Sequence, residues 1–168
     1  LMNRDHKKMS GFLGAGARFL CIGVLAMSII IGLGMPHMVW ADVTEEEAAA
    51  IEADLAEKVA AGMSYDQAAK EVAAERLAAG GNTADIGKAL GVAAVAVALD
   101  RGENVSVAVT GVSQGTVEAS VQAAVNAGGD AGAAALQASQ GTGEGAVIAA
   151  VDNGQDVSVA ASAAAAGA

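Results

Sequence analysis

Few side chains in this sequence could do chemistry, and nearly all of them are lysines or carboxylates. Both histidines and the single cysteine precede residue 42. Residues 42–168 therefore lack the imidazole and thiolate that zinc, iron and most nucleophilic sites require. Three lysines remain there, Lys58, Lys70 and Lys88, each among acidic neighbours. Such lysines serve solubility, so we expect no catalytic residue, no cofactor and no enzymatic activity.

Oxygen ligands alone can bind calcium, and four acids accompany glycines in the C-terminal region. They are Asp130, Glu144, Asp152 and Asp156. These acids do not alternate as densely as those of dedicated calcium loops. An Asp shortly after a glycine is also typical of a helix N-cap. We interpret Asp130, Asp152 and Asp156 as turn and cap residues, and weak calcium binding by the four acids stays open as an alternative.

The balance of charge disfavours two classes of partner. The chain has 19 acidic and 9 basic residues and a formal net charge of -10 at pH 7, and four of the basic residues precede residue 42. A segment this acidic repels phosphate backbones and anionic lipid. We therefore expect residues 42–168 to bind neither nucleic acid nor a membrane surface.

Residues 1–41 follow the order of a secretory signal peptide, with basic, then apolar, then small residues. An uncharged apolar run covers 19–34, and Val39-Trp40-Ala41 places small residues at the -3 and -1 positions of a signal peptidase site. We predict cleavage between Ala41 and Asp42 and export to the periplasm or the cell exterior. The alternative is an inner-membrane anchor formed by residues 19–41, because about 20 such residues can cross a bilayer.

Residues 42–101 are predicted to form three capped helices. The expected starts are Thr44 with Glu47 as a capping box, Ser64 with Gln67 as a second one, and Thr83 as a third cap. The expected ends are Gly62, Gly80-Gly81 and a point near Arg101. The segment 91–99 is apolar on nearly all sides, which predicts a helix buried in the middle of the fold.

Residues 102–168 contain a regular ladder of glycines, each thirteen residues after the last. The ladder consists of Gly102, Gly115, Gly128, Gly141, Gly154 and Gly167. It divides the segment into five units that have polar ends and a small, apolar middle. We predict that each unit is a helix of about eight to ten residues followed by a turn at the glycine. Helices this short are unstable alone, which indicates an α-solenoid-like array of neighbouring units.

Two alternatives concern the same segment. Residues 104–112 and 156–160 alternate between polar and apolar in the manner of strands, so a β-solenoid in 102–168 is possible. Runs of alanine in the middle units favour helices instead. Low-complexity disorder would not keep so strict a period. The prediction is therefore an all-α fold, with three longer helices followed by the short-helix array.

The function expected from these features is structural. The core is thin because alanine is abundant, no cysteine remains to form disulfides, and the final unit, ending in AASAAAAGA, lacks a polar cap. We expect an exported, non-enzymatic protein that forms a homo-oligomer or binds another envelope protein through its small-residue helices. The alternative is a monomeric helical-repeat module that binds a peptide or a glycan.

Overall fold

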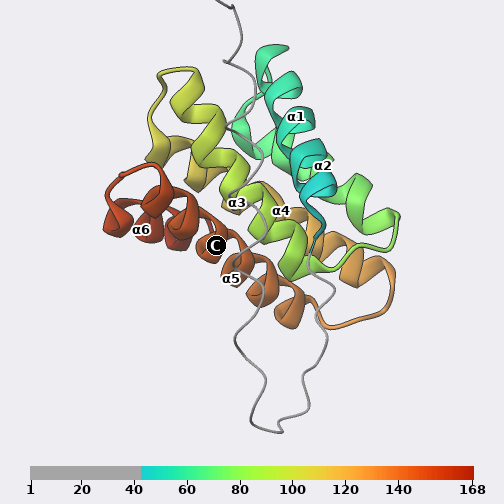
Figure 1. The fold of residues 1–168 in the computed structure, drawn as a ribbon. Coiled ribbons are helices and arrows are strands. Elements are labelled where there is room, and N and C mark those ends of the chain that lie inside the picture. Colours follow the sequence, from blue (N-terminus) through green and yellow to red (C-terminus); the bar gives the residue numbers. More distant parts are fainter. Residues whose placement is uncertain (1–42) are drawn as a thin grey trace, which may run out of the picture. The chain divides into compact units, whose positions relative to one another are not determined.

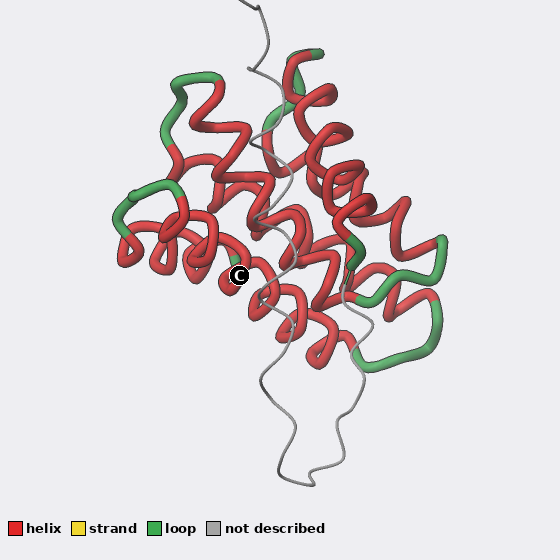
Figure 2. The backbone as a smooth tube through the Cα atoms, viewed as in Figure 1, coloured by secondary structure: helices red, strands yellow, loops and turns green. Residues whose placement is uncertain are grey.

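The computed structural model describes residues 43–168, and this part of the chain folds entirely into helices joined by short turns (Figure 1; Figure 2). The helices are α1 (Glu45–Ala60), α2 (Tyr65–Ala78), α3 (Thr83–Asp100), α4 (Val105–Asn126), α5 (Ala131–Asp152) and α6 (Val157–Gly167). The expected all-α class is confirmed. The β-solenoid alternative is wrong, because residues 102–168 contain no strand. The predicted signal peptide and its cleavage site between Ala41 and Asp42 lie outside the described residues.

One turn design joins every pair of consecutive helices in 43–168. A glycine with positive φ stands two residues before the next N-cap, in a conformation that L side chains rarely adopt. These glycines are Gly62, Gly80, Gly102, Gly128 and Gly154. In the turn after α3, the amide of Gly102 donates to Leu99 O (3.0 Å) and that of Glu103 donates to Ala98 O (2.8 Å). This is the Schellman pattern, which satisfies the last carbonyls of a helix and reverses the chain.

The helix starts confirm one of the three caps expected in residues 42–101 and correct the other two. Thr44 accepts a hydrogen bond from the Glu47 amide (3.2 Å). Asn82, and not Thr83, caps α3, because its side-chain oxygen accepts from Ala84 N (2.8 Å). Ser64 occupies the N-cap position of α2 but makes no side-chain cap hydrogen bond, so the second capping box is not formed.

The predicted short helices are wrong, because α4 and α5 each run for 22 residues. Their N-caps, Asn104 and Asp130, are two ladder steps apart. Gly102, Gly128 and Gly154 do lie in turns and are called the turn glycines. Gly115, Gly141 and Gly167 lie within α4, α5 and α6, so a turn at these three positions was a wrong expectation. They are called the contact glycines.

The helices form two layers in which each helix lies beside the helix two places along the chain. One layer contains α1, α3 and α5, and the other contains α2, α4 and α6. Consecutive helices face each other across the layers. Neighbours within a layer run in the same direction: Gly141 lies against the segment from Ala84 to Lys88, and Gly145 against that from Lys88 to Val92. In Figure 1, α1 and α2 lie toward one side of the described region and α6 toward the other.

The core changes in character along the chain. Its largest fully buried apolar side chains come from α1 to the first half of α4: Ile51, Leu55, Val72, Ile86, Leu90, Val95, Val109 and Val112. The α3 segment 91–99 lies in this core, as its apolar sequence predicted. In α5 and α6 the buried apolar side chains are all alanines. Burying an alanine removes little apolar surface from water, so we infer that α5 and α6 are held less firmly by side-chain burial.

Candidate interaction surface

The three lysines first considered for chemistry all pair with carboxylates of neighbouring helices. Lys58 of α1 lies 2.9 Å from Glu71 of α2, and that hydrogen bond is the main reason why the pKa of Lys58 is raised. Lys70 pairs with Glu118 of α4 (3.0 Å), and this contact lowers the pKa of Glu118. Ion pairs of this kind link helices at the protein surface. Each of the three lysines is therefore engaged in such a pair.

The four acids considered for calcium are dispersed over different roles. Asp130 and Asp156 cap α5 and α6, and each accepts hydrogen bonds from amides of its own helix. Glu144 pairs with Lys88 of α3 (2.8 Å), whereas Asp152 is the last residue of α5. Within residues 43–168 no three His, Cys, Asp or Glu side chains come together in a way that could hold a metal ion.

The chain's single tyrosine forms a polar contact between α2 and the turn after α3. Tyr65 donates its hydroxyl to Glu103 (2.8 Å), and Arg101 also donates to that carboxylate (2.8 Å). Partial burial, reinforced by the bond to Glu103, raises the pKa of Tyr65 to about 12. The same bond, followed by that from Arg101, lowers the pKa of Glu103. Gly111 of α4 lies close to the same tyrosine, so Tyr65 contacts α4 as well as the turn after α3.

The contact glycines bring helix backbones together within each layer. A Cβ atom on Gly115 would overlap the carbonyl of Asp66, and one on Gly141 would overlap the carbonyl of Ala84. Gly167 has the same relation to the carbonyl of Thr110. On the facing helix, Gly87 and Gly91 of α3 likewise lie against the backbone of α5. Helix association within a layer therefore depends on absent side chains, as in the small-residue packing of closely crossing helices.

Sequence reasoning did not separate the two kinds of ladder glycine. The signal that distinguishes them is their immediate surroundings. Contact glycines Gly115 and Gly141 each occur in the sequence Ser-Gln-Gly-Thr, with Glu three residues later. Turn glycines are each followed two residues later by Asn or Asp, which becomes the N-cap. A period of two ladder steps was therefore present in the sequence.

Several large apolar side chains of α5 and α6 are exposed, whereas the apolar side chains buried in these helices are alanines. In most folded proteins the large apolar side chains are buried instead. Leu136 and Val151 are 58% and 60% exposed, and Ile148 is also exposed. Both valines of α6, Val157 and Val159, are exposed as well. Every exposed large apolar residue found in 43–168 belongs to α4, α5 or α6. Exposed apolar side chains that gather into one patch are typical of surfaces that contact another molecule.

A groove lies between α5 and α6, next to several of these side chains. It has a volume of about 530 Å³ and is lined mainly by small and apolar residues. Its α5 wall includes Ser139, Gln140, Gly143, Glu144, Val147 and Ile148, and its α6 wall includes Ala161 and Ala165. Leu136 continues the same stripe one helical turn before Ser139 and Gln140. We call this set of residues, from Leu136 to Ile148 with Ala161 and Ala165, the α5–α6 edge.

A second groove of about 480 Å³ lies between α2 and α4. Its walls are mostly alanine, with Leu77 at one side and Gln122 and Asn126 at the other. The side-chain amide of Gln122 donates to Asn126 Oδ1 (2.9 Å) on that wall. This groove offers an apolar surface with a polar margin, suited to one side chain of a bound peptide.

None of the helices in the described part of the chain combines the length and apolarity that crossing a bilayer requires. Comparison with known proteins found no matching protein-family model, no matching curated protein and no matching solved structure.

Proposed function

We propose that this chain is an exported, non-enzymatic structural protein that associates with copies of itself through small-residue helices. The observation that supports it most directly is the reversal in α5 and α6, where alanines are inside and Leu136, Ile148 and Val151 are outside. A monomer would gain stability by burying those large side chains. Leaving them in water is consistent with a surface that another molecule covers.

We further propose that the described helices are an α-solenoid-like array. The two layers, the parallel neighbours and the repeated Ser-Gln-Gly-Thr sequence of α4 and α5 support it. The repeating element is one helix with its turn, which spans two ladder steps from α4 onward. In such an array each helix contacts only nearby helices, so an additional helix could join an exposed side without disturbing the rest.

The test of self-association is the mass of the exported chain in solution. The full chain would be secreted by a bacterial host, purified after export, and studied by size-exclusion chromatography with light scattering at micromolar concentration and neutral pH. We expect a mass above that of the monomer. A monodisperse monomer over this concentration range would contradict the proposal.

Export and processing need a separate measurement. N-terminal sequencing of the secreted chain is expected to begin at Asp42. A start at Met2, with the protein in the membrane fraction, would instead support the anchor formed by residues 19–41. Another envelope protein remains the alternative partner, and it would copurify with the secreted chain from the native envelope.

The second candidate function is a monomeric module that binds a peptide or glycan, and the α2–α4 groove is the observation that favours it. Replacing Ala123, which lines this groove, by Trp would fill the groove. Under this alternative, Ala123→Trp abolishes binding of a peptide library while the mass in solution stays that of the monomer. Retained peptide binding by this variant would count against the groove.

A further inference from the structure

We propose that the α5–α6 edge is the surface through which two copies of this chain meet, and that the result is a closed dimer in which each copy presents this same edge. The inference rests on the proposed self-association and assigns it a place. Three features support it: the corresponding side of α4, which α6 covers; the distribution of charge; and the shape of the edge.

The matching surface lies on α4. Here α6 packs on the side of α4 that bears Thr110 and Ser113, whose hydroxyls donate to Ala163 O (3.1 Å) and Ala164 O (2.8 Å). The repeat places Leu136 and Ser139 of α5 at the corresponding positions. Within residues 43–168, Leu136 is exposed and Ser139 lines the open groove beside α6. The structure thus shows what such a face accepts, namely a parallel helix of small residues.

The hydroxyl groups of Ser139 and Ser113 donate their hydrogen bonds to different kinds of carbonyl group. Ser139 donates to Ala135 O of its own helix (2.8 Å), whereas Ser113 donates to a carbonyl of the helix packed on it. A hydroxyl can rotate to a new acceptor without moving the backbone. Ser139 can therefore satisfy a carbonyl of an incoming helix as Ser113 does.

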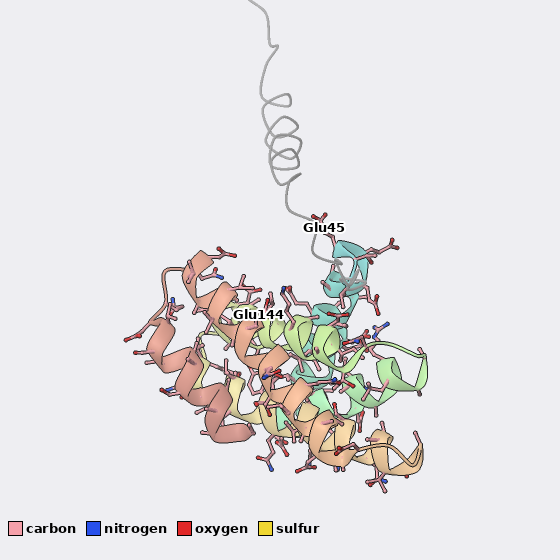
Figure 3. All side chains as sticks on the ribbon, turned by 90° about the horizontal axis from the view of Figure 1, so that it is seen from below. Glu45 and Glu144 are labelled. Carbon is pink, nitrogen blue, oxygen red and sulfur yellow. The ribbon has the colours of Figure 1, made fainter. Side chains whose placement is uncertain are left out.

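Charge selects which surface of a second copy can occupy the edge. Among the side chains of the α5–α6 edge only Glu144 is charged, and it pairs with Lys88. By contrast, α1 begins with Glu45, Glu46 and Glu47; Figure 3 labels Glu45 at that start and Glu144 on α5. Burying the α1 start would desolvate unpaired carboxylates. The same uncharged edge of a second copy avoids this penalty.

The shape of the edge is suited to meeting itself. Leu136 projects beside the groove, where it can pack against Leu136 of the other copy, and Gly143 leaves room for close approach. A Cβ on Gly143 would meet only Ala164, at an ordinary 3.8 Å, so this glycine is not required by the fold of one copy. All neighbours within a layer are parallel, and a two-fold axis parallel to α5 keeps that arrangement. Such contacts are isologous, so they close at two copies.

The decisive variant is Leu136→Glu, in the full secreted chain, compared with Val125→Glu. The two side chains are equally exposed, at 58% and 57%. Val125 follows Glu118 and Gln122 along the α2 side of α4, away from the edge. We expect Leu136→Glu to raise the dimer dissociation constant by more than about tenfold, because it buries a carboxylate beside its counterpart. We expect Val125→Glu to leave the constant unchanged, with the same helical circular dichroism for both.

Crosslinking provides an independent measurement in a chain whose edge is otherwise intact. Gln140→Cys is made with Cys21→Ser, and Gln67→Cys in the same background is the control, since both glutamines are exposed. A short bis-maleimide reagent is expected to join two copies through residue 140 and not through residue 67. Equal crosslinking at both positions would overturn the assignment.

The outcomes separate this inference from the proposed function. A wild-type dimer that Leu136→Glu dissociates supports both. A wild-type oligomer that both glutamate variants leave intact preserves self-association and overturns the edge. Open-ended oligomers that grow with concentration overturn the closed dimer. A wild-type monomer overturns both proposals.

Discussion

Absent side chains determine how closely the helices of one layer approach each other. Gly141 permits backbone contact with α3, while Gly143, on the same helix, faces only Ala164 at ordinary distance. The two glycines therefore have different physical roles although both lie in the middle of α5. The role of a glycine in α5 therefore depends on which atoms of the neighbouring helix lie opposite it.

Alanine at these two positions should change stability in opposite directions. Gly141→Ala is expected to lower the free energy of unfolding by about 1–3 kcal/mol, because the methyl group overlaps the Ala84 carbonyl. Gly143→Ala is expected to raise it by about 0.5–1 kcal/mol, as alanine is the better helix former. Urea unfolding followed by circular dichroism measures both. Equal effects would show that Gly141 does not make the close contact.

Ionisation of Tyr65 should report the contact between α2 and the turn after α3. Its pKa is raised from 10.0 to about 12, first by burial and then by the bond to Glu103. The folded state thus prefers the neutral phenol, so this contribution to stability is complete below pH 10 and is lost as the pH rises toward 12. Absorbance at the phenolate band should show titration near 12 in the native chain.

Replacing the carboxylate tests the second cause of that shift. Glu103→Ala should lower the pKa of Tyr65 while leaving it above 10, because burial remains. Circular dichroism at each pH controls for unfolding, which would restore the ordinary value. An unchanged titration in Glu103→Ala would mean that the Tyr65–Glu103 bond is not formed in solution.

At the scale of elements, five similar turns reverse the chain between the consecutive helices of residues 43–168. Each turn combines a glycine of positive φ with an N-cap residue that begins the next helix. Since both features are local, the reversal of the chain at each turn needs no contact with distant residues. The lengths of the helices between them then determine which residues face each other.

Adjacent glycines in the turn after α4 allow a matched test of this design. Gly128 has φ +69° and empty space around it, whereas Gly129 has ordinary φ and contacts at 3.5 Å or more. Gly128→Ala is expected to cost about 1 kcal/mol of folding free energy through conformational strain alone. Gly129→Ala is expected to be neutral or stabilising by up to about 1 kcal/mol. Thermal unfolding of the two variants decides this, and a larger loss for Gly129→Ala would contradict it.

For the whole of residues 43–168, helices from before and after residue 101 share one core. Leu90 and Val95 of α3 are buried in the same cluster as Val109 of α4 and Ala146 of α5. Backbone contacts between α3 and α5 run along both helices. The segment 42–101 therefore lacks most of its packing when separated from α4 and α5.

Truncation tests this dependence. A fragment of residues 42–101 is expected to lose cooperative thermal unfolding, because α3 would expose its glycine-lined side and much of its apolar surface. Residues 42–168 serve as the control in the same circular dichroism experiment. A fragment that unfolds cooperatively at the midpoint of the control would show that the first three helices form an independent unit.

The sequence by itself determined the helical class, several of the caps and the strict period. Thr44, Gly62 and the polar residues after the turn glycines act within a few residues of themselves, so local chemistry predicts them. The neighbouring residues mark the turn glycines and the contact glycines as different, but only the tertiary structure showed what each kind does. A turn position needs glycine because its φ is positive. A contact position needs glycine because the backbone of the neighbouring helix in the layer approaches it closely. The second requirement depends on residues such as Ala84, far away along the chain. For the same reason the exposed side of α5 could not be identified until the position of α6 on α4 was known.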